Sequence, residues 1–211
     1  MALFSKDLGI DLGTMYTRLA DSSQVLLEEP TIVVIEVDDQ KMVAVGMEAC
    51  DMFGKVPESI EVARSLRNGV IADYEISETL LQYLLQRVSG SMRIFRPRVM
   101  ISVPYGVTSV ERRAVYEAVM EAGSREAFLI QQPLAAAIGI DLPINSPSGN
   151  MLISLGGGCT ETAVMAMYGI VAADTLRAGG MDLDEAIVNY VRRKYGVVIG
   201  QVTAEQLKTR I

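Results

Sequence analysis

A strand, a glycine turn and a returning strand occur twice in this 211-residue sequence. The first copy covers residues 8–20 and the second covers residues 151–167. When Asp11 is set on Ser154, both copies place isoleucine, leucine, glycine and threonine at matching positions. This internal repeat favours a duplicated α/β domain in which one turn from each half faces a shared cleft.

Between and beyond these copies, the sequence alternates patterns typical of strands and helices. Apolar residues recur at helical spacing over 76–88, and Thr108 with Glu111 has the spacing of a capping box. Pro133 suits the first turn of a further helix. The other predicted elements are strands at 31–37, 42–45, 98–103 and 128–130, and helices over 182–194 and from a Thr203–Gln206 cap onward.

A stretch rich in Pro, Ser and Gly at 143–149 separates the two halves. We predict a first domain over residues 1–145, with a small insertion at about 33–65, and the start of a second domain over residues 150–211. The last predicted helix is still running at Ile211, so we expect the second domain to be incomplete.

Composition excludes several classes of function. The chain has no histidine, which rules out a Ser-His-Asp or Cys-His nucleophile and a histidine-ligated zinc site. Cys50 and Cys159 are too far apart in the sequence for a CxxC motif. The formal charge of −7 argues against nucleic acid as a partner, because binding to phosphates needs clustered cations. No signal peptide and no apolar run of about 18 residues is visible, so we expect a cytoplasmic protein.

The glycine turns are the candidates for a binding site. Glycine lets backbone N–H groups approach an anion without a Cβ in the way, and two facing turns can clamp a polyphosphate. The sequence has neither the GxxxxGK[ST] nor the GxGxxG fingerprint. For Gly156–Gly158 alone, a tight hairpin that binds nothing is an equally good interpretation.

Strings along the whole chain resemble one family. They are Asp11–Thr14, Pro30, Asn68–Tyr74, Phe95–Val99, Pro133–Gly139, Gly156–Gly158 and Ala178–Gly180. They look like the actin-fold ATPases and, more narrowly, the MreB family of bacterial cell-shape filament proteins. The resemblance implies an α/β, actin-like (ribonuclease H-like) fold of duplicated domains, with the second half incomplete in this chain.

The resemblance also implies that the cleft holds ATP and Mg²⁺ between two phosphate loops. On the matching positions, the first loop consists of Asp11, Gly13, Thr14, Met15 and Tyr16, and the second of Gly156, Gly157, Gly158 and Thr160. Glu205 and Lys208 match the family stretch near the adenosine. Asp11 is expected to reach the metal through water.

Three positions depart from the family pattern, and all three belong to the chemistry. Gln132 stands where the family has a glutamate that polarises the attacking water, and Ser154 where it has an aspartate that holds the water shell of the metal. Cys159 replaces a threonine. We therefore expect nucleotide binding with weakened hydrolysis. Alternatively, Gln132 orients the water through hydrogen bonds, as a glutamine does in Ras-type GTPases, and slow hydrolysis survives.

A second candidate region is the predicted loop that contains Ile94 and Phe95, which lie beside arginines. Such apolar residues can insert at an anionic membrane surface. The alternative is that Phe95 is buried in the domain as the next strand begins. The resemblance favours membrane contact, assisted by Leu3 and Phe4 near the N-terminus.

The function that the resemblance implies is a scaffold for cell-wall synthesis. The protein would bind ATP, assemble with copies of itself into filaments at the inner face of the cell membrane, and work with cell-wall synthesis and shape proteins. Two alternatives stay open: a nucleotide-binding adaptor that does not polymerise, and a small-molecule kinase of the same superfamily. A kinase needs a catalytic carboxylate in the cleft, which Gln132 and Ser154 do not supply.

Overall fold

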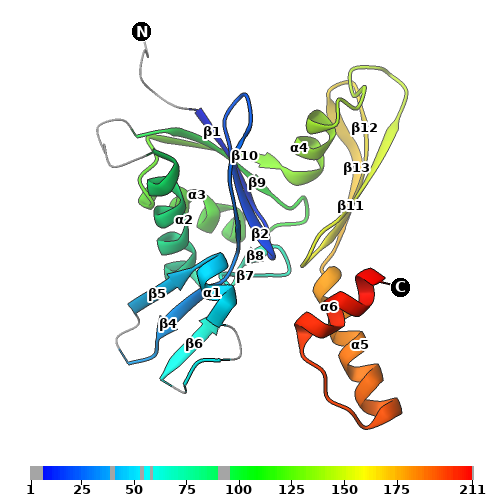
Figure 1. The fold of residues 1–211 in the computed structure, drawn as a ribbon. Coiled ribbons are helices and arrows are strands. Elements are labelled where there is room, and N and C mark those ends of the chain that lie inside the picture. Colours follow the sequence, from blue (N-terminus) through cyan, green and yellow to red (C-terminus); the bar gives the residue numbers. More distant parts are fainter. Residues whose placement is uncertain (1–6, 39–40, 53–54, 58, 90–95, 211) are drawn as a thin grey trace.

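The first glycine turn connects two strands of a five-stranded sheet (Figure 1). The computed structural model describes residues 7–38, 41–52, 55–57, 59–89 and 96–210. The strand order is β10–β9–β1–β2–β3, with β1 (Asp7–Leu12), β2 (Tyr16–Ala20), β3 (Val25–Pro30), β9 (Arg98–Val103) and β10 (Glu126–Gln131). Strand β9 is parallel to both β1 and β10, whereas β2 is antiparallel to its neighbours. The carboxyl ends of β1, β9 and β10 therefore meet at one edge of the sheet.

Two helices, α2 (Tyr74–Ser89) and α3 (Ser109–Glu121), cover one face of this sheet (Figure 1). Buried and exposed residues alternate along β1, as expected of a strand with one packed face. Four leucines of α2 are buried against that face. The predicted capping box is confirmed: the Thr108 side chain accepts the Glu111 N–H, and the Glu111 carboxylate accepts the Thr108 N–H.

A small three-stranded sheet is inserted between β3 and α2. It has the order β5–β4–β6, with β4 (Val33–Glu36), β5 (Lys41–Val45) and β6 (Ile60–Ala63), and α1 (Met47–Met52) packs on it. Glu29 joins this unit to α2, because its carboxylate binds Arg87 at 2.5 Å and accepts the Met47 N–H at 3.0 Å. The hairpin of β7 (Leu66–Arg67) and β8 (Val70–Ile71) follows the insertion.

The second glycine turn belongs to a separate antiparallel sheet of β11 (Asn150–Leu155), β12 (Thr160–Ala166) and β13 (Gly169–Leu176). Helix α4 (Gln132–Gly139) follows β10 directly and packs on this second sheet, where its Ala137 is buried with Leu152 and Met165. Helices α5 (Gly180–Tyr195) and α6 (Gln201–Arg210) contact each other. In Figure 1 they lie with the second sheet on the same side of the five-stranded sheet. Helix α4 therefore connects the two halves.

The structure confirms the predicted helices and hairpins and corrects one boundary. Helix α6 begins at Gln201, so Thr203 lies inside the helix and the prediction of a Thr203–Gln206 cap was wrong. The carbonyl of Gly200 accepts the Ala204 N–H at 3.0 Å, which makes this glycine the N-cap. Glycine is a preferred N-cap residue, so the pattern one turn later was misleading.

Candidate functional site

Both glycine turns close through the same backbone hydrogen bond. The Gly13 N–H donates to the Tyr16 carbonyl at 3.1 Å, and the Gly156 N–H donates to the Cys159 carbonyl at 2.8 Å. A Cβ atom would lie 2.7 Å from that carbonyl oxygen at Gly13 and 2.8 Å from it at Gly156. Only glycine fits so close an approach, so the repeat in the sequence is also a repeat in the structure.

The two turns also lie directly against each other, so the predicted facing of one turn by the other is present in the structure. A Cβ atom at Gly157 would lie 2.2 Å from Met15 Cγ, and one at Gly158 would lie 2.3 Å from Thr14 Oγ1. The Gly69 N–H donates to Thr14 Oγ1 at 3.0 Å and holds the first turn from the other side. Backbone amides from both halves are thereby brought close together, as a clamp for a polyphosphate requires.

The start of helix α5 fixes the second turn. The N–H groups of Gly180 and Met181 donate to the carbonyls of Gly156 and Gly157, each at 2.9 Å. A Cβ atom at Gly179 would lie 2.5 Å from the Gly156 carbonyl oxygen, so the helix can approach this closely only because the residue is glycine.

Helix α6 lines a cavity of about 150 Å³ beside the turns. Met15 and Tyr16 of the first turn border it, together with Glu205 of α6. Lys208 contacts α5 and does not line this cavity: its Nζ lies 2.8 Å from Asp184 Oδ1 and donates to the Gly180 carbonyl at 3.0 Å. The structure thus places Glu205 at the cavity and uses Lys208 to fasten α6 to α5.

Arg64 is a cavity residue that the sequence analysis did not identify. It ends the insertion and donates from Nη1 to the Thr14 carbonyl at 3.3 Å. Burial lowers the pKa of its guanidinium, while Cys50, Glu205 and Tyr16 act in the opposite direction. An arginine stays charged in proteins, so a cation faces the cavity beside the first turn.

Two of the positions expected to act in the chemistry, Asp11 and Gln132, meet at the carboxyl edge of the first sheet. Ser102 Oγ donates to Asp11 Oδ1 at 2.9 Å and accepts from Gln132 Nε2 at 3.5 Å. Arg18 Nη1 lies 3.6 Å from the other oxygen of Asp11. The Asp11 carboxylate is half exposed, as a contact to a metal through water requires. No motif had pointed to Ser102.

Ser154 and Cys159 lie on the second half. Ser154 is the cross-strand partner of Glu161 in the pairing of β11 with β12. Cys159 is buried, and burial, reinforced by the negative charge of Glu161, raises the pKa of its thiol to about 11. The thiol is therefore neutral near pH 7 and provides no thiolate for catalysis or for a metal.

Glu161 connects the two halves near the turns. Its Oε1 accepts the Tyr105 N–H at 2.6 Å and the Thr175 hydroxyl at 3.2 Å, and that hydroxyl accepts the Gly106 N–H at 3.1 Å. These bonds fasten the loop after β9 to β12 and β13. The carboxylate is buried, and burial raises its pKa while the bonds from Tyr105 and Thr175 partly offset the rise.

The raised pKa predicts a pH-dependent stability. A carboxyl whose pKa is higher in the folded state binds its proton more tightly there than in the unfolded chain. The proton on Glu161 therefore contributes most to the free energy of unfolding below the ordinary pKa of 4.5. This contribution decreases as pH rises from 4.5 through the raised pKa, and above the raised pKa it no longer changes. In urea unfolding at a series of pH values, the wild type should lose stability relative to Glu161→Gln across that window. A difference in stability between the wild type and Glu161→Gln that does not change with pH would contradict the raised pKa.

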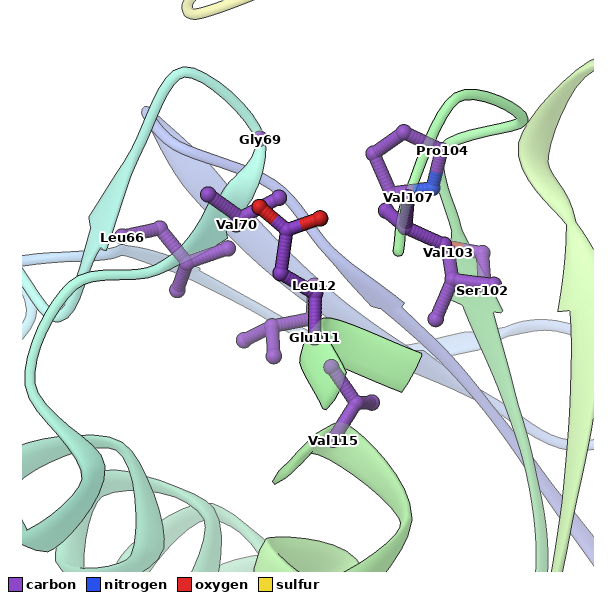
Figure 2. A pocket seen from close by; sticks show the side chains of 10 residues that line it. All are labelled: Leu12, Leu66, Gly69, Val70, Ser102, Val103, Pro104, Val107, Glu111 and Val115. Atoms are coloured by element: carbon purple, nitrogen blue, oxygen red, sulfur yellow. The ribbon is translucent and has the colours of Figure 1, made fainter. Parts of the chain in front are cut away.

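A second cavity, beside α3, is too small for a ligand. Its volume is about 10 Å³, and Figure 2 shows the Glu111 carboxylate among apolar side chains that include Leu66, Val70 and Val115. This space suits at most one water molecule. The candidate site is therefore the pair of glycine turns together with the larger cavity beside the first turn.

Two further predictions concern metals and membranes. Over the described ranges, no group of three or more acidic or cysteine side chains is arranged to hold a metal ion. Mg²⁺ is usually held by one or two carboxylates together with water and substrate phosphates, so the role predicted for Asp11 does not need such a group. No helix in the same ranges is long and apolar enough to cross a membrane. The predicted membrane contacts, Leu3, Phe4, Ile94 and Phe95, lie outside the described residues.

Two α/β halves with facing glycine turns and a connecting helix define a protein of the actin-like class. The chain belongs to the MreB/Mbl protein family, whose model matches residues 5–211. It is 47% identical to the cell shape-determining protein MreB of Haemophilus influenzae, over 99% of this chain and 61% of that protein. It is 37% identical to the cell shape-determining protein Mbl of Bacillus subtilis, over 99% of this chain and 63% of that protein.

A solved structure confirms the actin-like fold. MreB5 of Spiroplasma citri bound to ADP matches with a TM-score of 0.89 and 31% identity, over 97% of this chain and 61% of that one. The same protein bound to AMPPNP matches equally well. The present chain therefore spans about three-fifths of the length of the relatives that it matches.

Proposed function

We propose that this chain is an MreB-type cytoskeletal protein that binds ATP between its two glycine turns. The observation that carries the proposal is the direct contact of the turns, with Gly157 against Met15 and Gly158 against Thr14. The related MreB5 has been solved with ADP and with AMPPNP, which supports a nucleotide as the ligand.

Each part of the site has a role in this proposal. Backbone N–H groups of residues 14–16 and 157–160 bind the phosphates, while the N–H groups of Gly13 and Gly156 close the turns, and Glu205 contacts the adenosine from the cavity. Asp11 holds Mg²⁺ through water at the carboxyl end of β1. Lys208 acts indirectly, because its ion pair with Asp184 keeps α6 beside α5.

Hydrolysis is slow in this proposal. Gln132 is a neutral amide, Ser154 supplies no charge to the metal, and Cys159 is a neutral thiol. None of the three side chains can accept the proton of the attacking water as a carboxylate can. Binding is affected less than turnover, because the backbone groups that hold the phosphates are intact.

The biological role in this proposal is that of the family. The chain assembles with copies of itself into filaments at the inner face of the cell membrane and scaffolds cell-wall synthesis. Leu3, Phe4, Ile94 and Phe95 provide its membrane contacts. The names of the relatives, which are cell shape-determining proteins, support this role.

Titration calorimetry with Mg-ATP tests the site. We expect the wild type to bind and Gly158→Ala to bind at least about tenfold more weakly, because the new methyl group would lie 2.3 Å from Thr14 Oγ1 and force the turns apart. Gly139→Ala is the matched control, since a Cβ at Gly139 has no heavy atom within 4 Å. A wild type that does not bind, or equal affinities for the wild type and Gly158→Ala, would contradict the proposal.

A further inference from the structure

Ser102 occupies a central place at the carboxyl edge of the first sheet. It is next to last in β9, the strand between β1 and β10, and it is buried. Asp11 follows Ile10, the residue of β1 that pairs with Ile101. Helix α4 begins with Gln132, immediately after β10. The topology therefore brings a hydroxyl, a carboxylate and an amide together from three elements.

The direction of the hydrogen bonds in this cluster follows from chemistry. A carboxylate oxygen can only accept, so Ser102 gives its single hydrogen to Asp11 Oδ1, at 2.9 Å. The lone pairs of the Ser102 oxygen are then left to accept. The Gln132 amide satisfies them with its Nε2 donor, at 3.5 Å.

This direction also fixes the orientation of the Gln132 amide. Nitrogen and oxygen lie on opposite arms of the planar group, so an Nε2 bound to Ser102 turns Oε1 away from it. Oε1 is then the arm that can accept a hydrogen bond from water. Among the residues that the structure describes, the bond to Ser102 is the one hydrogen bond found for the Gln132 side chain. An amide turned by 180° would offer the water only donors.

We propose that Ser102 is a positioning residue for ATP hydrolysis, which holds Gln132 with its carbonyl oxygen available to the attacking water. This inference rests on the proposed function and deepens it. The water oxygen bonds to the γ-phosphorus as the bond from that phosphorus to the bridging oxygen breaks, and the electron pair of the broken bond leaves with ADP. The amide takes no proton, so the proton of the water passes to the released phosphate. Gln132 contributes by orienting the water, and its effectiveness depends on Ser102.

Two variants of Ser102 and one matched control test the proposal. Ser102→Ala removes the hydroxyl, and Ser102→Thr keeps it. Ser124→Ala removes a second buried hydroxyl; Ser124 follows α3, and its hydroxyl donates to the Val119 carbonyl of that helix. We expect Ser102→Ala to keep its affinity for Mg-ATP within about twofold and to release phosphate roughly tenfold more slowly in a single turnover. Ser102→Thr should restore the rate, and Ser124→Ala should leave it unchanged.

A second readout needs no nucleotide. In a ¹⁵N spectrum, the Gln132 side-chain amide is the pair of signals that disappears in Gln132→Glu. This pair should shift in Ser102→Ala, return in Ser102→Thr, and stay in place in Ser124→Ala. If the Gln132 side-chain signals do not shift in Ser102→Ala, Ser102 does not position the amide. An unchanged rate of phosphate release in Ser102→Ala would also overturn the positioning role. A wild type that fails to bind Mg-ATP overturns the proposed function, while the side-chain signals still decide whether Ser102 orients the amide.

Discussion

Gly179→Ala should destabilise the protein and release the second glycine turn. The new methyl carbon would lie 2.5 Å from the Gly156 carbonyl oxygen and 2.7 Å from that of Gly157. Both contacts are with backbone, which cannot rotate away as a side chain does. We expect the free energy of unfolding to fall by about 3 kcal/mol, at the upper end for overpacking. The affinity for Mg-ATP should fall at least about tenfold as the turn moves.

Gly180→Ala is the control for this prediction. A Cβ atom there would meet Lys208 Nζ at 3.3 Å, and Nζ is the end of a flexible side chain that can move. The control should therefore lose much less stability in urea unfolding and retain most of its affinity in calorimetry. Equal losses at Gly179 and Gly180 would mean that the contact of α5 with the turn does not control the site.

The sequence predicted the parts of the fold that have strong local patterns. Helix α2 was visible from its apolar spacing and α3 from its capping box, because both signals lie within a few residues. In the insertion, β4 and β5 were predicted, whereas α1 and β6 were missed. Its helix α1 has only six residues, and β6 pairs with β4 across more than twenty positions of the chain, so neither leaves a local pattern.

The residues of the candidate site also fall into those that a local sequence pattern predicts and those that it does not. The glycine turns were predicted because each lies within a short strand–glycine–strand pattern, and the carbonyl that excludes a Cβ at Gly13 or Gly156 is only three residues further along the chain. Arg64, Ser102 and Glu161 were missed because each acts through a distant partner. The contact of Arg64 with Thr14 spans 50 positions, that of Ser102 with Asp11 spans 91, and that of Glu161 with Tyr105 spans 56. Sequence patterns based on residue spacing do not relate positions this far apart in the chain.

Restoring the two family carboxylates should accelerate hydrolysis. We expect Gln132→Glu combined with Ser154→Asp to raise the rate of phosphate release at least about tenfold, because a glutamate can accept the proton of the attacking water. The aspartate adds negative charge for the water shell of Mg²⁺. Single-turnover phosphate release with saturating Mg-ATP measures the effect, and an unchanged rate would contradict the view that these positions limit turnover.

Each single variant should gain less in the rate of phosphate release than the double variant, for a structural reason at each position. Ser102 gives its only hydrogen to Asp11, so a glutamate at position 132 finds no donor there. An aspartate at position 154 would lie opposite the buried Glu161 in the pairing of β11 with β12, where like charges repel. Ser154→Asp should therefore melt at a lower temperature than Ser154→Asn without nucleotide, and Mg-ATP should narrow this difference. A difference that Mg-ATP leaves unchanged would show that position 154 does not act on the metal, and the gain in rate would then have to come from position 132 alone.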